Sequence, residues 1–243
     1  MTGTEIDTLQ EKLNRLTADF EDFTYIVSHD FKAPLRAISN LSDWIVEDLG
    51  TDLQEDVAES LRLLKSRVAR MEQMLESILA VSRVSRFDLD VVETDVAGLI
   101  KEIGGRLEAP DSFKIEVEGT AQLMTYRTKL GQAIELLLDN AVRFGEHPGC
   151  SATVSIDEGP DALHITVADN GPGVADHIKD KMFRIFSTTL TDIEPPATGK
   201  GLALAKRIAE FAGGTLNYNP DHSPGAAFVL HWPKSINAAT DAS

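Results

Sequence analysis

The chain of 243 residues can form one large domain or two small ones, and 42% hydrophobic with 26% charged residues is typical of a globular protein. With 23 Lys and Arg against 39 Asp and Glu, the net charge is −16, which argues against a nucleic-acid partner. The single cysteine, Cys150, excludes an intramolecular disulfide and a cysteine-ligated zinc site. We expect a cytoplasmic protein without a membrane span, because no apolar run reaches roughly 18 residues and the N-terminus does not resemble a secretory signal.

Residues 1–84 are predicted to form a helical hairpin, because apolar residues recur at alternating steps of three and four in two heptad stripes. The first stripe contains Ile6, Leu9, Leu13, Leu16, Phe20, Phe23 and Val27, and the second contains Val57, Leu61, Leu64, Val68, Met71, Leu75 and Ile78. Pro34 is expected to kink the first helix, Gly50 to end it and Asp52 to cap the second. One hairpin cannot cover both stripes, so the pattern predicts a homodimer that forms a four-helix bundle, with the leucines and methionines in its core.

Residues 85–94 are predicted to be a linker that runs into a strand, residues 95–236 a mixed domain and residues 237–243 a disordered tail. Helices are expected at 96–107, 128–144 and 201–211, and strands at 113–117, 152–156, 163–167, 215–218 and 227–232. A turn cluster separates the second and third of these strands and indicates a hairpin. The elements do not alternate as βαβ units, which favours an α+β sandwich over a Rossmann-type sheet.

The first candidate site is His29 with Asp30, in the first predicted helix. Continuing the heptad places Val27 on the apolar stripe and His29 two positions further, where it faces solvent. An imidazole beside a carboxylate is typical of a nucleophile with an adjacent general base. An ordinary surface histidine has the same neighbours, so the pair by itself leaves both interpretations open.

Two further candidates follow in the second domain. Asp169 ends a predicted strand, and Gly171 and Gly173 behind it allow a sharp turn against a ligand while the carboxylate accepts a hydrogen bond. Asn140 lies with Arg143 on the apolar helix 128–144, where a metal ion or a ligand can satisfy a half-buried amide. An ordinary turn and a structural asparagine remain the alternatives.

The last candidate is the segment that contains Gly199, Lys200, Gly201 and Leu202, at the start of a predicted helix. Free N–H groups and the helix dipole converge at such a start and favour an anion, and Lys200 adds a positive charge. The spacings of a Walker A loop and of the dinucleotide fingerprint are both missing. A plain helix start is the alternative.

The order and spacing of these segments resemble the sensor histidine kinases of two-component systems. SHDFKAPL resembles the H-box of this family, ELLLDNAVRF its N-box, DNGPG its first glycine box, MFRIF its F-box and TGKGLALAKRIAEFAGG its second glycine box. The five motifs cover nearly the whole chain in the family's order. The resemblance implies an all-α dimerisation and phosphotransfer hairpin, followed by an α+β sandwich of the GHKL ATPase type.

The resemblance also implies roles for the matching residues. His29 would be the phosphoacceptor, Asp30 would take its proton, Asp169 would bind the adenine amino group and Asn140 would hold Mg²⁺, with Arg143 nearby. The other ATP-binding residues would be Gly171, Gly173, Gly199, Lys200, Gly201 and Leu202, and Phe183 and Phe186 would anchor a lid over residues 187–198. The implied function is ATP-dependent autophosphorylation of His29 and transfer to an aspartate of a response-regulator receiver domain. The expected input comes from an upstream sensor protein or from a segment outside this chain.

Three departures from the family pattern leave alternatives open. Leu136 stands where many relatives carry a second Asn, and Glu135 points about 100° away from that position. Ala33 replaces the Thr or Asn that helps relatives to dephosphorylate the regulator, and residues 187–199 contain no Lys or Arg, so that Lys200 is the candidate substitute. The alternatives are a histidine phosphotransferase with a degenerate ATP-binding domain and a non-catalytic dimeric scaffold.

Overall fold

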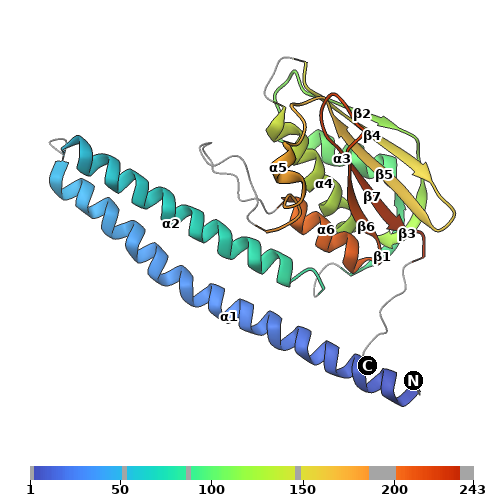
Figure 1. Ribbon diagram of the computed structural model, residues 1–243, viewed down its shortest axis with the longest axis horizontal. Coiled ribbons are helices and arrows are strands. Elements are labelled where there is room, and N and C mark those ends of the chain that lie inside the picture. Colours follow the sequence, from blue (N-terminus) through green and yellow to red (C-terminus); the bar gives the residue numbers. More distant parts are fainter. Residues whose placement is uncertain (1–2, 51–53, 86–88, 146–148, 186–200, 236–243) are drawn as a thin grey trace. The chain divides into compact units, whose positions relative to one another are not determined.

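The computed structural model describes residues 3–50, 54–85, 89–145, 149–185 and 201–235 of the chain (Figure 1). The chain divides into two compact units, of which the first is helical and the second begins at Val84. The first unit contains α1 (Gly3–Leu49) and α2 (Glu55–Ser82). The second contains β1 (Val91–Asp95), α3 (Val96–Arg106), β2 (Lys114–Glu118), β3 (Gln122–Tyr126), α4 (Arg127–Phe144), β4 (Ser151–Glu158), β5 (Ala162–Asp169), α5 (Asp176–Lys179), α6 (Gly201–Phe211), β6 (Thr215–Asn219) and β7 (Ala227–Pro233).

The predicted helical hairpin is confirmed, but only one of the two expected helix caps agrees with the structure. Gly50 follows α1 with a φ of +64°, the left-handed conformation that glycine adopts without strain, as expected for a C-terminal cap. The expectation that Asp52 caps the second helix is wrong, because α2 begins at Glu55 and its N-cap is Gln54, which makes no side-chain cap bond. Asp52 itself lies outside the described residues.

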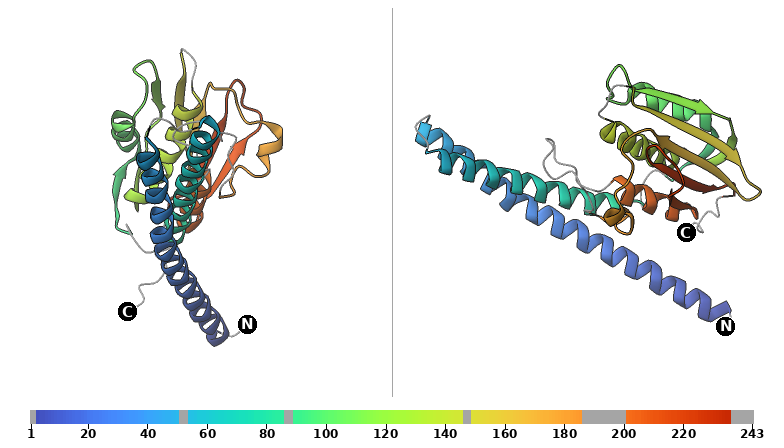
Figure 2. Two further views of the ribbon diagram at one scale, coloured as in Figure 1. Left: turned by 90° about the vertical axis from the view of Figure 1, so that its left-hand side faces the viewer. Right: turned by 45° about the horizontal axis from the view of Figure 1, so that its top comes forward.

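Pro34 lies inside α1 without ending it. Figures 1 and 2 draw α1 as one unbroken helix, and the kink expected at this proline stays a prediction. The missing N–H of Pro34 frees the carbonyl of Asp30, four residues earlier. Asp30 is exposed, so water can bind this carbonyl and the helix loses little by continuing.

On α1 the residues buried against α2 lie on a different stripe from the predicted heptads, whereas on α2 the buried Val68 belongs to the predicted stripe. The buried residues of α1 are Thr24, Ser28, Leu35 and Ser42, whereas Leu16, Phe20, Phe23, Leu41 and Trp44 are exposed. Thr24 and Ser42 donate their hydroxyl hydrogen bonds to the carbonyls of Phe20 and Ile38, which satisfies these polar groups within the helix. The buried stripe and the exposed apolar stripe of α1 are roughly 110° apart at 100° per residue.

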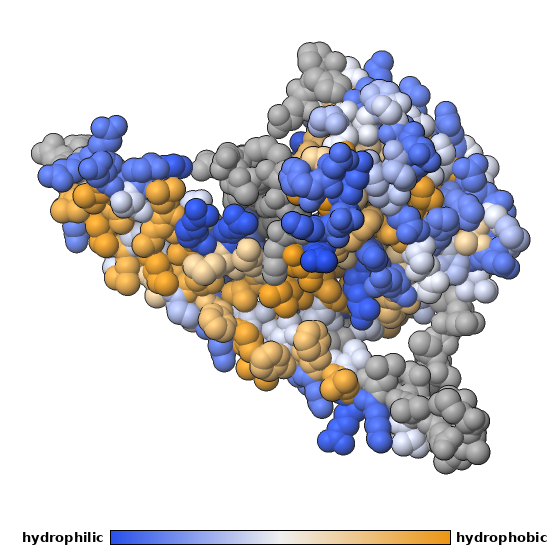
Figure 3. Space-filling view, in the orientation of Figure 1, coloured by the Kyte–Doolittle hydropathy of each residue, from blue (hydrophilic) through white to orange (hydrophobic). Residues whose placement is uncertain are grey.

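In a single chain, therefore, the apolar stripe is uncovered. The expectation that the leucines and methionines are core residues of a dimeric bundle stays a prediction, since in the single chain Leu35 is buried whereas Leu64 is 41% and Met71 42% exposed. Apolar side chains accordingly gather along the surface of the hairpin in Figure 3. An exposed apolar patch of this kind usually marks an interaction surface.

The second unit is the predicted α+β sandwich. Its five-stranded sheet has the order β2-β4-β5-β7-β6, with β2 parallel to β4 and the other neighbours antiparallel. Helices α3, α4 and α6 cover one face of the sheet (Figure 2). The predicted hairpin of β4 and β5 is confirmed by their pairing, in which Val154 lies opposite Val167. In both strands alternate residues are buried, as one covered face requires.

A second, two-stranded sheet was not predicted. Strand β3 pairs with β1 in antiparallel register, and Thr94 lies opposite Leu123. The buried Trp232 of β7 donates its Nε1 hydrogen to Thr125 Oγ1 of β3 at 2.7 Å, which satisfies both polar groups in the core. This contact links the small sheet to the large one.

Two histidines face each other across the central strands on the other face of the sheet. His164 of β5 lies opposite His231 of β7, and the centroids of the two rings are 4.6 Å apart. Burial, and then the neighbouring His164, hold the pKa of His231 below its ordinary value. Protonation of His231 therefore opposes folding.

We expect this pair to make the second unit less stable in acid. A lowered pKa in the folded state contributes stability that is present above the unfolded pKa of about 6.5 and is lost as the pH falls through the folded pKa. The difference in Tm between the parent and His231→Gln should therefore change as the pH falls from about 7 to about 5, with the parent losing more. His177→Gln, at an exposed position of α5, serves as the control. Parallel pH profiles of the parent and His231→Gln contradict this prediction.

Candidate functional site

His29 lies on the exposed surface of α1, where its side chain is 73% exposed. Its Nδ1 is 3.2 Å from Asp30 Oδ1. A carboxylate accepts hydrogen bonds, so Nδ1 is the donor when the neutral ring makes this contact, and Nε2 then has a lone pair. The predicted pairing of His29 with Asp30 is present, and the His29 ring is accessible from solvent.

In the second unit, α4 brings together the three segments that the sequence singled out. A Cβ built on Gly201, at the start of α6, would lie 3.9 Å from the carbonyl oxygen of Leu136 on α4. A Cβ built on Gly171 would lie 3.2 Å from the carbonyl oxygen of Phe144, two turns further along α4. Asn140 is midway between these two contacts. The start of α6, Asn140 and the loop after β5 therefore border one region.

Asp169, the last residue of β5, is buried and held by backbone groups. Its Oδ1 accepts hydrogen bonds from the N–H of Gly171 at 2.9 Å and from the N–H of Ala226 at 3.1 Å. Asn170 closes the same loop, since its side chain accepts from the N–H of Ser151 and donates to the carbonyl of Gly149. The two bonds to Oδ1 fix the carboxylate and leave the lone pairs of Oδ2 for a donor on a ligand.

The loop before β7 also contacts Asp169. The sequence did not predict this contact. His222 Nε2 lies 3.1 Å from the carbonyl oxygen of Asp169, and the ring nitrogen must be the donor because a carbonyl only accepts. Gly225 has a φ of +96°, and a Cβ there would lie 1.8 Å from the same carbonyl oxygen. The glycine in this turn was a visible signal, but nothing in the sequence tied it to Asp169.

The glycines after Asp169 fit the predicted close approach of the backbone. Gly173 has a φ of +76°, and a Cβ there would lie 3.0 Å from the carbonyl oxygen of Gly225. A Cβ on Gly171 would lie 3.0 Å from Asp169 Oδ1. A side chain at either position would displace the carboxylate or the loop that contacts it, so both glycines are needed for the loop to pack closely around Asp169.

The remaining predicted residues are described in part. Asn140 is half-buried, and the exposed Arg143 lies 3.6 Å from Asp139, so its charge is partly balanced. Gly201 and Leu202 form the first turn of α6 and are half-buried. Gly199, Lys200 and Phe186, with the predicted lid over residues 187–198, lie outside the described residues. Phe183 packs edge to face against Phe228 in the core.

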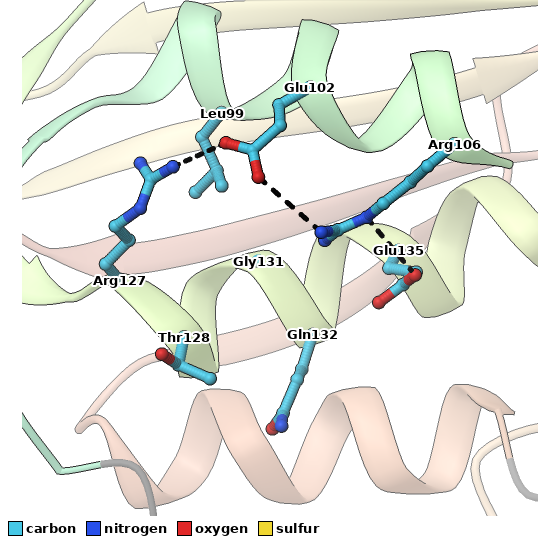
Figure 4. A pocket seen from close by; sticks show the side chains of 8 residues that line it. All are labelled: Leu99, Glu102, Arg106, Arg127, Thr128, Gly131, Gln132 and Glu135. Carbon is cyan, nitrogen blue, oxygen red and sulfur yellow. Dashed lines mark hydrogen bonds and ion pairs between the residues drawn. The ribbon is translucent and has the colours of Figure 1, made fainter.

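Glu135 is directed away from Asn140, as expected. Its Oε1 lies 3.8 Å from Arg106 Nε, in a pocket between α3 and α4 (Figure 4). In the same pocket Glu102 lies 2.6 Å from Arg127 and 3.5 Å from Arg106. None of the residues that line this pocket belongs to the predicted site. Glu135 therefore belongs to this pocket and not to the region around Asn140.

Comparison with known proteins identifies the same two parts. Residues 20–86 match the family described as the His Kinase A (phospho-acceptor) domain, and residues 125–236 match the histidine kinase-, DNA gyrase B-, and HSP90-like ATPase family. The cyanobacterial phytochrome B of Nostoc sp. is 30% identical over 232 residues, which are 93% of this chain and 31% of that protein. The chain thus spans about a third of the length of the curated relatives it matches.

Two solved structures share the fold. The full-length ShkA, crystallised with AMPPNP, is similar with a TM-score of 0.62 and 21% identity, over 90% of this chain and 47% of that one. The histidine kinase ThkA, in complex with the response regulator protein TrrA, is similar with a TM-score of 0.62 and 17% identity, over 94% of this chain and 67% of that one. No helix in the described ranges combines the length and apolarity needed to cross a bilayer.

Proposed function

Because this chain belongs to the sensor histidine kinases of two-component systems, we propose that it is an ATP-dependent protein-histidine kinase that phosphorylates His29. The observation that carries the proposal is the exposed His29, whose Nδ1 is paired with Asp30. The ordered loop around Asp169 supports it, since a phosphotransferase that no longer binds ATP has no use for a rigid adenine site. Labelling with γ-labelled ATP and Mg²⁺ tests the proposal, and a parent protein without acid-labile, base-stable label contradicts it.

The proposed reaction is an in-line transfer to His29. Nε2 attacks the γ-phosphorus, the bond to the bridging oxygen of ADP breaks, and Asp30 takes up the Nδ1 proton as the ring becomes positively charged. The distance of 3.2 Å between Nδ1 and Asp30 is at the long end for a hydrogen bond and shortens as the charge develops. Phosphoryl transfer depends chiefly on positioning and charge neutralisation, which these residues supply.

The nucleotide is proposed to bind where α4, the start of α6 and the loop after β5 meet. Asp169 accepts a hydrogen bond from the adenine amino group, and Gly171 and Gly173 form the wall beside it. The first turn of α6, with Gly201 and Leu202, binds the phosphates through its free N–H groups, and Gly199 and Lys200, which precede it in the sequence, would contribute to the same site. Asn140 would hold Mg²⁺, with Arg143 nearby, and that ion neutralises phosphate charge.

A receiver domain of a response regulator is the proposed acceptor of the phosphoryl group. Its aspartate would receive the phosphoryl group from Nε2 of His29, which is regenerated. The likeness to ThkA, which was solved in complex with a response regulator protein, supports this partner. The fully exposed position of His29 also suits a second protein that must reach it.

A second copy of the chain is the proposed partner of the apolar stripe on the hairpin. Leu64→Glu with Met71→Glu should convert the dimer to a monomer, because unpaired charges in a bundle core are strongly destabilising. Both side chains are exposed in the single chain, so the hairpin itself should remain helical. Light scattering measures the mass, and circular dichroism measures the helix content.

Ser66→Glu with Ala69→Glu is the matched control for this prediction, because both residues are exposed on the same helix but lie off the stripe. This control should remain a dimer. A parent protein that is monomeric at all concentrations contradicts the proposed assembly.

Ala33 predicts weak phosphatase activity toward the phosphorylated regulator. It lies one turn after His29 on α1, is exposed, and carries no hydroxyl or amide to orient a water. Ala33→Thr should accelerate decay of the phosphorylated receiver domain, whereas Ala37→Thr, one turn further along, should not. The measurement is the decay rate with and without the protein. Rapid decay with the parent shows that another group orients the water.

A further inference from the structure

Tyr25 lies between the phosphoacceptor and the end of α2. It precedes His29 by one turn of α1, and the centroids of the two rings are 6.3 Å apart, with 31° between their planes. Arg83, the C-cap residue of α2, has its Cζ 5.2 Å from the centroid of the Tyr25 ring. We call Arg83, Tyr25 and His29 the positioning row. All three side chains belong to the helical unit, so the row exists within one compact body.

An exposed histidine needs contacts of this kind if its ring is to keep one orientation. The contact with Asp30 is a single long hydrogen bond to the adjacent residue, and adjacent helix residues do not face each other. Residues four apart do face each other, so the Tyr25 ring limits the rotamers of the His29 ring. Tyr25 is itself 49% exposed and depends on a partner to stay in place.

Arg83 is that partner. A guanidinium within about 6 Å of an aromatic centroid is attracted to the face of the ring, and Arg83 meets this condition. The nearby Lys32 is engaged differently, because its Nζ lies 3.7 Å from Glu76 and joins the two helices as an ion pair. The end of α2 is thus tied to Tyr25, and Tyr25 to His29.

We propose that Tyr25 and Arg83 are positioning residues for the phosphorylation of His29. Arg83 holds the Tyr25 ring, and Tyr25 holds the imidazole in the rotamer in which Nδ1 donates to Asp30 and Nε2 is free to attack. Neither residue contacts the nucleotide in this proposal. The inference rests on the proposed kinase function and adds two residues to it, neither of which belongs to the motifs that indicated that function.

The test measures initial autophosphorylation rates of the full chain over a range of ATP concentrations. Tyr25→Leu should lower the maximal rate about 3- to 10-fold, and Arg83→Gln about 2- to 5-fold. Tyr25→Phe and Arg83→Lys should retain most of the rate, because the ring and the cation remain. The KM for ATP should not change, since the proposed nucleotide site is in the other unit. Arg67→Gln, an exposed cation earlier on α2, is the control and should match the parent.

The double variant decides whether the three residues act in series. Once Tyr25 is replaced by Leu, Arg83→Gln should not lower the maximal rate further, because Arg83 acts through the Tyr25 ring. An equal loss in both backgrounds overturns the row and indicates that Arg83 acts on the phosphoryl group directly. Equal rates for the parent and Tyr25→Leu overturn the inference and leave the kinase function intact, whereas an unlabelled parent overturns both.

Nitrogen-15 spectra of the histidine rings give a second readout that does not depend on catalysis. Comparison with His29→Gln assigns the His29 signals in the full chain. The parent should show His29 protonated mainly at Nδ1 in its neutral form, and Tyr25→Leu should shift the population toward the Nε2 tautomer. Identical tautomer populations in the two proteins contradict the proposed positioning.

Discussion

His29→Gln is expected to abolish phosphorylation of the protein while ATP binding stays intact. Glutamine has no nucleophilic nitrogen, because the lone pair of its amide nitrogen is delocalised into the carbonyl, so the acceptor is removed completely. The site of the change is exposed on α1, and its hydrogen bond is made to its own neighbour Asp30. We therefore expect the helix, the proposed dimer and the nucleotide site proposed in the second compact unit to be unaffected.

The measurement is incorporation of label from γ-labelled ATP, read after acid and after base treatment, together with a nucleotide titration of the same preparation. His177→Gln, an exposed histidine on α5, is the matched control and should be labelled like the parent. Label that persists in His29→Gln at the parental level means that another residue is the acceptor. Loss of nucleotide binding in the same variant would show instead that the two units are not independent in this respect.

The helical unit was predictable because its signals are local. A heptad stripe depends on residues three or four apart, and the position of Gly50 depends on one backbone conformation. The stripe correctly indicated the helices but not the surface that joins them. On α1 that surface combines Leu35 with Thr24, Ser28 and Ser42, whose small polar side chains allow two helices to approach closely and, at Thr24 and Ser42, bond to their own backbone. Hydrophobicity alone does not reveal the polar part of such a surface.

In the candidate site, too, the residues found from the sequence have a local signal, whereas the residues that were missed depend on contacts between distant parts of the chain. The sequence identified Asp169 and its glycines because they follow a strand directly, and it identified Asn140 because an amide interrupts an apolar helix. It did not identify His222 or Gly225, which are about fifty residues further along and meet Asp169 only through the antiparallel pairing of β5 with β7. Contacts that depend on strand order need the fold.

Asp169→Asn is expected to weaken ATP binding about 10- to 100-fold without unfolding the domain. The asparagine keeps a carbonyl oxygen, which can accept the hydrogen bonds that Gly171 and Ala226 donate to Oδ1. The amide NH₂ then replaces Oδ2 and presents donors to the adenine amino group, which is also a donor. A buried polar group left without its partner costs about 1–3 kcal/mol, which corresponds to the expected change in affinity.

The same substitution is expected to change the preference between bases, which a merely structural role of Asp169 does not. Guanine carries an acceptor, O6, where adenine carries its amino group. The affinity for GTP should therefore fall less than that for ATP, or rise, so the ratio of the two affinities moves toward GTP. Competition titrations with both nucleotides measure this ratio, and Asp161→Asn, in the exposed turn between β4 and β5, controls for the loss of one charge. If Asp169→Asn weakens the binding of ATP and of GTP equally, or changes neither affinity, then Asp169 does not bind the adenine amino group.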